Sequence, residues 1–204
     1  DIVILPSDTP LYGQLQSVPT SARIVPWQTC PDFQSEALSL ASVDDWTQRP
    51  AYTIYTSGST GRPNGVMISR ASLAYFVHSA NQSYQITAQD RVLQFAPLHF
   101  DASVEELFMS LCHGATLILR NDAMLDSMTA FTDACVRLRI SVLDLPTAFW
   151  HEWVYGAEQL NHQAHDLRLV IVGGEAVLAE KLKYWQTQMG RSVRLLNRYG
   201  PTET

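Results

Sequence analysis

Residues 92–119, VLQFAPLHFDASVEELFMSLCHGATLIL, decide the fold of this chain. The stretch begins with one apolar run at residues 92–95 and ends with another at residues 116–119, and each run predicts a buried strand. Between them, residues 102–112 have the apolar spacing of a helix, and Gly114 follows as a residue typical of helix ends. A strand, a helix and a strand in this order form the basic unit of a parallel sheet.

The same alternation continues on both sides of this stretch. Further strands are expected at residues 2–5, 51–55, 66–68, 142–145, 169–172 and 193–196. Further helices are expected at residues 70–84, 126–138, 147–155 and 178–189. Residues 6–50 are rich in proline and are predicted to be mostly loop. The pattern predicts an α/β fold with mainly parallel sheets flanked by helices on both faces.

Composition excludes several classes of protein. The chain has 204 residues, a net charge of −6, 46% hydrophobic and 17% charged residues, which is typical of a folded domain and not of intrinsic disorder. The acidity argues against a nucleic-acid partner, and no apolar run is long enough to span a membrane. The three cysteines form no CxxC pair, which favours reduced thiols in a cytoplasmic protein. The chain starts at Asp1 without methionine and stops inside a motif, so we expect a piece of a longer protein.

Polar and glycine residues gather at the predicted strand ends. They follow Tyr55 and Phe95, lie at Asp144 and Gly173, and follow Asn197. In open α/β sheets, ligands bind beyond the carboxyl ends of the strands. The sequence therefore predicts a small-molecule site on this side of the sheet.

The densest of these segments is the loop at residues 55–65, YTSGSTGRPNG. Its glycines leave backbone N–H groups open and its hydroxyls add donors, which suits phosphate oxygens. It is not a Walker A loop, because no G-x-x-x-x-G-K-[ST] can be read from it. The alternative is a flexible Ser/Gly hairpin loop.

The loop resembles the phosphate-binding signature of the adenylate-forming enzymes, the superfamily of acyl-CoA synthetases, luciferases and the adenylation domains of nonribosomal peptide synthetases. Two further segments resemble motifs of the same superfamily, residues 197–204 (NRYGPTET) and residues 100–108 (FDASVEELF). The FDAS form is similar to that of amino-acid-activating domains. The resemblance implies that residues 1–204 are the central part of the large adenylation domain, with the N-terminal subdomain and the C-terminal lid domain outside it.

The resemblance also implies a reaction and its partners. An amino acid would be activated with ATP and Mg²⁺ as aminoacyl-AMP, in a ligase-type reaction. The acyl group would then pass to the phosphopantetheine of a carrier protein domain, beside neighbouring synthetase domains. The chain alone is expected to be incomplete and inactive, and neither nucleic acid nor membrane is expected as a partner.

The resemblance assigns the nucleotide site residue by residue. Phosphate contacts would come from Thr56, Ser57, Gly58, Ser59, Thr60 and Gly61. The adenosine side would be lined by Gly173, Gly174, Glu175, Asn197, Tyr199 and Gly200. Thr202 would contact phosphate and Glu203 would coordinate Mg²⁺, both as catalytic residues. The alternatives are a simple strand-to-helix turn at Gly173-Gly174 and a solvated surface carboxylate at Glu203.

The substrate pocket is assigned in the same way, to Asp101, Ala102, Glu105, Asp144, Ile171, Gly173 and Arg198. Asp101 would pair with the α-ammonium of the substrate, since a buried cation needs a charged partner; the alternative is that it only caps a helix. Three acids against one arginine predict a polar substrate side chain, foremost a cationic one. Two alternatives stay open: Arg198 neutralises one acid internally and the substrate is neutral and polar, or Glu105 faces solvent.

The chain departs from the family pattern at one position of the phosphate loop. The family's Pro-Lys-Gly is here Pro63-Asn64-Gly65, so a cation near the phosphates is replaced by a neutral amide, although Arg62 is adjacent. This departure keeps open a degenerate, non-catalytic module. A second alternative is an aryl- or acyl-CoA synthetase, against which Asp101 argues, because a substrate without an α-ammonium gives it no partner.

Overall fold

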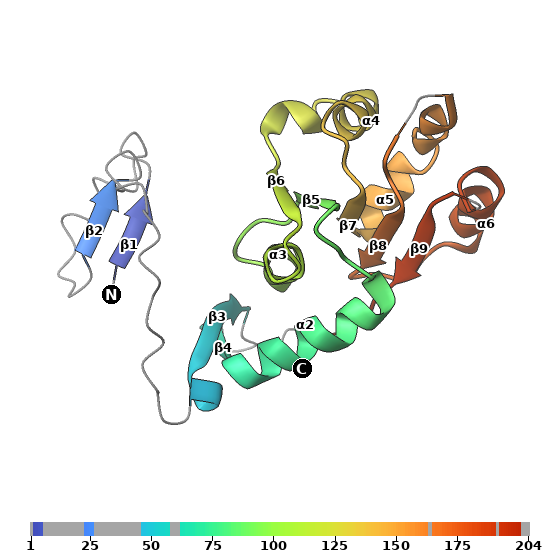
Figure 1. Cartoon of the computed structure of the whole chain (residues 1–204). Coiled ribbons are helices and arrows are strands. Elements are labelled where there is room, and N and C mark those ends of the chain that lie inside the picture. The colour runs from blue at the N-terminus through green and yellow to red at the C-terminus, as the bar shows by residue number, and fades with distance from the viewer. Residues whose placement is uncertain are drawn as a thin grey trace. The chain divides into compact units, whose positions relative to one another are not determined.

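The computed structural model describes residues 2–5, 23–26, 46–57, 62–162, 165–190 and 192–200. The chain divides into two compact units, Asp1–Asp44 and Asp45–Thr204. In the first unit, β1 (Ile2–Leu5) pairs in parallel with β2 (Arg23–Pro26) (Figure 1). The strand predicted at residues 2–5 is confirmed. β2 falls where loop was predicted, because only Ile24 and Val25 mark it, next to Pro26 in a proline-rich segment.

The second unit contains a sheet of five parallel strands in the order β6-β5-β7-β8-β9 (Figure 1). Its strands are β5 (Arg91–Gln94), β6 (Thr116–Leu119), β7 (Val142–Pro146), β8 (Leu169–Gly173) and β9 (Arg194–Asn197). β7 and β8 are buried along most of their length, as their continuous apolar runs predict. The predicted α/β fold with a mainly parallel sheet is confirmed.

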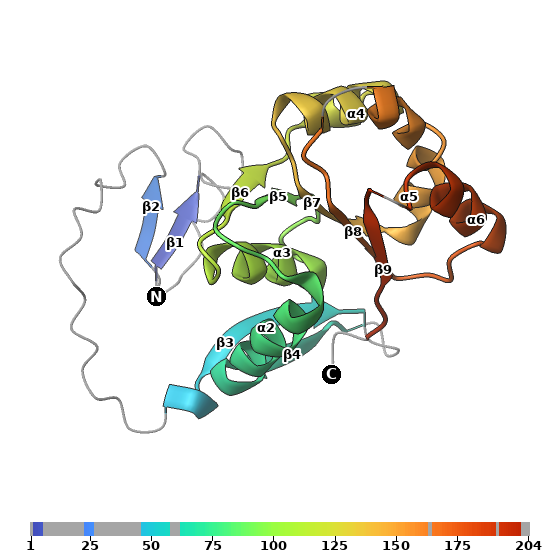
Figure 2. The ribbon, with the colours of Figure 1, turned by 45° about the vertical axis from the view of Figure 1, so that its right-hand side comes forward.

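Helices cover both faces of this sheet (Figure 2). One core contains Leu143 and Val170 of the strands and belongs to the side of α4 (Met128–Arg137), α5 (Thr147–Trp153) and α6 (Ala179–Gln188). The other contains Val142 and Ile171 and belongs to the side of α2 (Arg70–Tyr84) and α3 (Asp101–Leu111). Successive residues of a strand point to opposite faces of the sheet, so the side chains of neighbouring positions belong to different cores.

Helix boundaries differ from the predictions by a few residues, and α4 shows the physical reason. It starts at Met128 and not at residue 126, because the Ser127 side chain accepts a hydrogen bond from the Ala130 amide and caps the helix. The preceding residues form a short 3-10 helix, η3 (Asp122–Leu125), which apolar spacing does not reveal. Two others, η2 (Trp46–Gln48) and η4 (Ala157–His162), were likewise not predicted.

A separate hairpin carries the start of the phosphate-loop motif. β3 (Pro50–Thr56) pairs antiparallel with β4 (Asn64–Ser69), which confirms the predicted return strand. α2 follows at once, because the Ser69 side chain accepts a hydrogen bond from the Ser72 amide at 3.1 Å and caps the helix. The hairpin tip, residues 58–61, lies outside the described residues.

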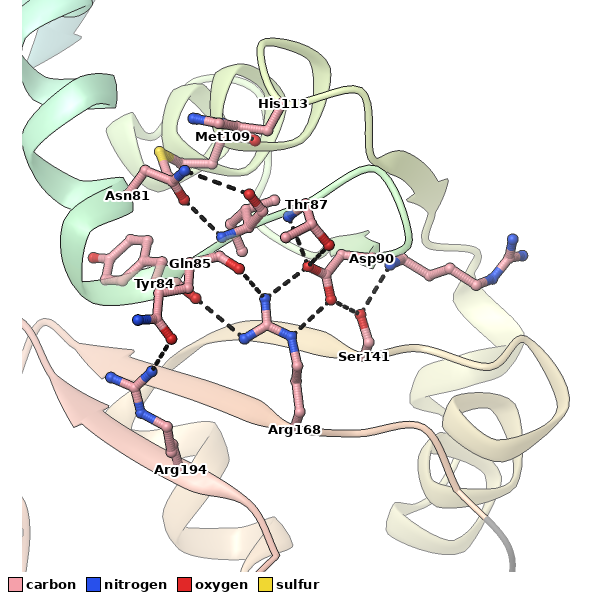
Figure 3. Close-up of polar contacts among 12 residues, drawn as sticks. Asn81, Tyr84, Gln85, Thr87, Asp90, Met109, His113, Ser141, Arg168 and Arg194 are labelled. Atoms are coloured by element: carbon pink, nitrogen blue, oxygen red, sulfur yellow. Dashed lines mark hydrogen bonds and ion pairs between the residues drawn. The ribbon is translucent and has the colours of Figure 1, made fainter.

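A polar network fastens α2 to the amino ends of the strands (Figure 3). Arg168, just before β8, donates to both Asp90 oxygens (Nε to Oδ1 2.8 Å, Nη2 to Oδ2 2.7 Å). The same guanidinium donates to the backbone oxygens of Tyr84 (3.1 Å) and Gln85 (2.8 Å) at the end of α2. Ser141, before β7, donates to Asp90 Oδ1 at 2.7 Å. Asp90 and Arg168 together therefore link the starts of three strands to the end of α2.

We expect Asp90→Asn to lower the unfolding free energy at neutral pH by about 2 kcal/mol. Burial raises the pKa of Asp90, but the hydrogen bonds from Arg168, Ser141 and Thr87 outweigh it and bring the pKa to about 2. Since the folded pKa lies below the unfolded value, this stabilisation is present above about pH 4 and is lost as pH falls toward about 2. Urea unfolding of the wild type and of Asp90→Asn measures this effect. The difference between their unfolding free energies should become smaller from about pH 6 to about pH 3. The exposed Asp126→Asn is the control, and a difference that stays constant with pH would contradict the prediction.

Candidate functional site

The register of the sheet brings Asp144 to the carboxyl side of the strands, on the face that α2 and α3 cover. Asp144 on β7 lies beside Ile171 on β8, and Ile171 lies beside Leu196 on β9. Ile171 and Leu196 belong to the core on the α2 and α3 side, so Asp144 points to the same side. Asp144 is only 5% exposed. Its carboxylate thus lies on the face of the sheet that α3 covers, and Asp101 is the first residue of α3.

Arg198 joins two buried acids in an ion cluster with Glu105 and Asp144. Its Nη1 donates to Glu105 Oε2, and its Nη2 lies 3.3 Å from Asp144 Oδ2, an ion-pair distance without hydrogen-bond geometry. The backbone N–H of Arg198 donates to Val172 O at 2.8 Å, which places the residue directly beyond β9. Glu105 is 3% exposed, so the alternative in which it faces solvent is wrong. Position 105 lies on the face of α3 that turns toward the sheet.

The cluster leaves two carboxylate oxygens without a hydrogen bond among the described residues, Glu105 Oε1 and Asp144 Oδ2. Burial raises the pKa of Asp144 well above its usual value, and the charges of Glu106 and Asp101 raise it further. Burial lowers the pKa of Arg198, which the nearby Tyr84 and Asp101 partly offset. Burial also raises the pKa of Tyr84 to about 12. Acidic groups therefore outnumber cations in a poorly solvated region.

Two cavities meet at this cluster. A cavity of about 390 Å³ lies at the strand ends, within the usual range of small-molecule sites, and a cavity of about 1020 Å³ lies between α2, the hairpin and the end of β9. Asp101, Arg198 and Gly200 line both cavities. The smaller cavity is also lined by the predicted residues Ala102, Asp144, Gly173 and Gly174.

Gly173 and Gly174 form a strand-to-helix turn that is also a wall of the smaller cavity. Gly174 has φ +93°, a conformation that favours glycine, and a Cβ on Gly173 would lie 3.2 Å from the Arg198 carbonyl oxygen. The Thr147 hydroxyl, buried after β7, donates to the carbonyls of Gly173 (3.0 Å) and Glu175 (3.3 Å). The simple-turn alternative is thus correct as geometry, and the turn also lies at the site.

Asp101 is the first residue of α3 and not its cap. The cap position is Phe100, whose backbone is extended, so the helix-cap alternative for Asp101 is wrong. A carboxylate in the first turn still gains from the positive end of the helix dipole. Asp101 also lies one helical turn from Glu105, and both line the larger cavity.

The other predicted residues lie at different depths. Glu175, Asn197 and Ser57 are exposed, and Tyr199 is 97% exposed, while Asn197 and Tyr199 line the larger cavity. Ile171 is buried in the core and does not line either cavity. Thr56 ends β3 opposite Asn64. Residues outside the described ranges are Gly58, Ser59, Thr60, Gly61, Thr202 and Glu203, so Mg²⁺ coordination by Glu203 stays a prediction.

The structure adds residues that the sequence reasoning did not single out as part of the site. Glu106 and Thr147 are buried and form hydrogen bonds with the backbone at the ends of β5 and β8. Tyr84 lines the larger cavity. The only available signal for Glu106 was its place beside Glu105, as a second acid among the apolar residues Val104, Leu107 and Phe108. Within the described ranges, no group of three or more His, Cys, Asp and Glu side chains is placed to hold a metal ion.

A parallel α/β sheet with a glycine turn and a buried acid–arginine cluster at its carboxyl end is typical of α/β proteins that bind small molecules. The family model described as AMP-binding enzyme matches residues 11–204, and the chain belongs to this family. The predicted resemblance to adenylate-forming enzymes is thereby confirmed. Among the described residues, no helix is long and apolar enough to cross a bilayer.

Similar proteins include large synthetases. An isonitrile lipopeptide synthase of Streptomyces coeruleorubidus is 57% identical over 75% of this chain and 10% of its own length. Tyrocidine synthase 1 of Brevibacillus parabrevis is 34% identical over 76% of this chain and 13% of its own length. The chain therefore spans about a tenth of the length of these curated relatives.

Solved structures share the fold. The nonribosomal peptide synthetase FmoA3 in its α-methyl-L-serine-AMP-bound form is 25% identical, with a TM-score of 0.77 over 100% of this chain and 22% of its own. The Vibrio cholerae adenylation domain AlmE, in complex with glycyl-adenosine-5′-phosphate, is 25% identical, with a TM-score of 0.73 over 99% of this chain and 37% of its own. Both likenesses confirm the fold class of an adenylation domain.

Proposed function

We propose that this chain is the central part of an amino-acid adenylation domain of a nonribosomal peptide synthetase. The substrate carboxylate would attack the α-phosphate of ATP, forming aminoacyl-AMP and releasing pyrophosphate. The names of the similar synthetases and the bound aminoacyl adenylates of FmoA3 and AlmE support this reaction. Such a reaction needs positioning and charge stabilisation more than covalent chemistry by the protein.

Asp101 would bind the α-ammonium of the amino acid. It lines both cavities at the start of α3, where its carboxylate can face a cation held at the strand ends. Gly173 and Gly174 would let the adenine approach the backbone, and Tyr199 would stack on it. Mg²⁺, held by Glu203, would neutralise phosphate charge when bound.

The side chain of the substrate is proposed to be a hydrogen-bond donor, foremost a cation. The observation that carries this is the pair of buried carboxylate oxygens, Glu105 Oε1 and Asp144 Oδ2, that accept no hydrogen bond from the residues that the structure describes. Arg198 is shared between both acids, so one positive charge faces two potential negative charges. A buried carboxylate oxygen that accepts no hydrogen bond is costly, and an incoming ammonium or guanidinium would donate one to it.

A neutral polar substrate is the second candidate, and one observation favours it. Arg198 donates to Glu105 directly, which neutralises that acid within the protein. The raised pKa of Asp144 would let it bind as a neutral carboxyl group. A hydroxyl or amide side chain would then fit in place of a cation.

The remaining steps are proposed from the similar proteins. The aminoacyl group would pass to the phosphopantetheine of a carrier protein domain within a cytoplasmic multidomain synthetase. The 57% identity to an isonitrile lipopeptide synthase makes a related lipopeptide a candidate product.

The test is amino-acid-dependent ATP–pyrophosphate exchange by the natural full-length protein. The panel contains lysine, ornithine, arginine, glutamine, serine and leucine, each beside its des-amino acid where one exists. We expect the highest rate with a cationic side chain and little exchange with the des-amino acids. Exchange only with large apolar amino acids would contradict the proposed side chain. Preference for the des-amino acids would favour an acyl-CoA synthetase, and absence of both exchange and calorimetric ATP binding would favour a non-catalytic module.

A further inference from the structure

Glu106 on α3 is enclosed below the segment that joins β5 to α3 and is 1% exposed. Its Oε1 accepts backbone hydrogen bonds from Phe95 (2.9 Å) and Ala96 (3.0 Å). Its Oε2 lies within hydrogen-bond distance of the Ala96 amide (3.2 Å) and of Gln94 Nε2 (3.3 Å). The pairing of β5 with β6 ends at Gln94 and Leu119. Glu106 therefore supplies the acceptors for the first amides beyond the strand.

The residues that Glu106 holds lead directly to Asp101. Ala96 and Pro97 line the smaller cavity, and so do Phe100 and Asp101. The Phe100 amide donates to the Pro97 carbonyl at 2.9 Å, which closes the segment into a turn. Glu106 itself is not among the residues that line either cavity. One helix thus carries Asp101 and also anchors the segment from which Asp101 emerges.

We propose that Glu106 is the positioning residue of Asp101. By holding the Phe95 and Ala96 amides, it fixes the start of α3 and so sets the affinity for the α-ammonium of the substrate. This inference rests on the function proposed above for Asp101. The nucleotide contacts proposed for the hairpin loop and Tyr199 come from other elements, so ATP affinity should not depend on Glu106.

The charge state of Glu106 decides how the test is run. Burial raises its pKa to about 7, although the Ala96 and Phe95 amides, Gln94 and the nearby Arg120 act to lower it. Asp144 faces it from β7 as a further acid. A protonated carboxyl offers fewer acceptor sites to the amides than a carboxylate does. Variants are therefore compared at about pH 8, where the carboxylate form prevails.

The test measures pyrophosphate exchange by the natural full-length protein with the amino acid of the panel that the wild type activates fastest. We expect Glu106→Ala to raise the KM for that amino acid about 10-fold or more and to leave the KM for ATP within about twofold. Glu106→Gln keeps one oxygen for the Phe95 and Ala96 amides and should recover most of the loss. Glu152→Ala, at an exposed position of α5, is the matched control and should change neither value.

A double variant separates positioning from a merely structural role. Because Glu106 would act through Asp101, the amino-acid KM of Asp101→Ala/Glu106→Ala should be no higher than that of Asp101→Ala alone. Amide hydrogen exchange adds a readout that does not depend on activity. Glu106→Ala should accelerate exchange at Phe95 and Ala96, and Glu106→Gln should not. If Glu106→Ala does not fold, Glu106→Asp replaces it, since its carboxylate is withdrawn from the segment by one methylene.

The outcomes distinguish the two proposals. Equal rises in both KM values, additive effects in the double variant, or unchanged exchange at Phe95 and Ala96 overturn the role of Glu106 only. A wild-type protein that exchanges with no amino acid overturns the proposed function and, with it, this inference.

Discussion

Asp101→Ala should lower kcat/KM for the activated amino acid by about 100-fold or more and leave ATP affinity unchanged. The proposed partner of Asp101 is an ammonium taken out of water, and an unpaired buried cation costs about 3 kcal/mol or more. That cost corresponds to about a hundredfold loss, since about 1.4 kcal/mol is a factor of ten. Pyrophosphate exchange with amino acid and ATP varied in turn measures both effects.

The control for this prediction is Asp133→Ala, at an exposed position of α4. It removes one negative charge from the same unit without touching either cavity, so both KM values should stay as in the wild type. A des-amino analogue of the substrate should bind Asp101→Ala as well as it binds the wild type. A loss confined to ATP binding would contradict the proposed role of Asp101.

Arg198→Met should lower the unfolding free energy by about 3 kcal/mol at about pH 8. The substitution keeps the apolar stem but leaves Glu105 and Asp144, which are 3% and 5% exposed, without their cation. Removing one partner of a buried ion pair is costly because the other charge stays desolvated. Urea unfolding of variant and wild type measures the difference.

The difference in unfolding free energy between Arg198→Met and the wild type should become smaller as pH falls. Burial already raises the pKa of Asp144 well above its usual value, and removing the arginine raises it further. A carboxyl with a raised folded pKa favours the folded state below its unfolded pKa and loses that contribution as pH rises through the folded pKa. The variant should therefore be closest to the wild type at about pH 4.

Arg139→Met is the matched control for this experiment. Arg139 pairs with Asp166 at 2.9 Å, but this pair lies at the surface, so its removal should change stability little. The double variant Glu105→Leu/Arg198→Met removes one acid together with the cation and should recover part of the loss. An Arg198→Met protein as stable as Arg139→Met at every pH would contradict the prediction.

Most elements of the sheet unit could be predicted from local pattern. The helix over residues 70–84 matches α2, because a long periodic run carries a strong signal, and the strand over residues 116–119 matches β6, because three of its four residues are apolar and branched. β2 was missed because only Ile24 and Val25 mark it within a proline-rich segment, and the 3-10 helices were missed because they are short. The start of α4 was missed because one serine side chain decides it.

The site was predictable where a residue type serves one local purpose. Gly173 ends β8 and Gly174 follows it with a positive φ, so that turn could be expected from sequence. The ion-pair partners of Arg198 could not be predicted in this way, because Glu105 lies far from Arg198 in sequence and Asp144 belongs to a third segment. Which of several acids receives one guanidinium depends on the register of β7, β8 and β9.

The sequence by itself determined the α/β class, the parallel sheet and the family of this protein, because strand period, helix period and the glycine-rich and FDAS motifs are local properties. Only the tertiary structure decided that Glu105 is buried, that Arg198 is shared between two acids, and that Glu106 anchors the segment leading to Asp101. These contacts join residues of different elements, which for Arg198 are distant in sequence, and their energies depend on burial and distance. Neither quantity exists until the strands are paired and the helices are packed on the sheet.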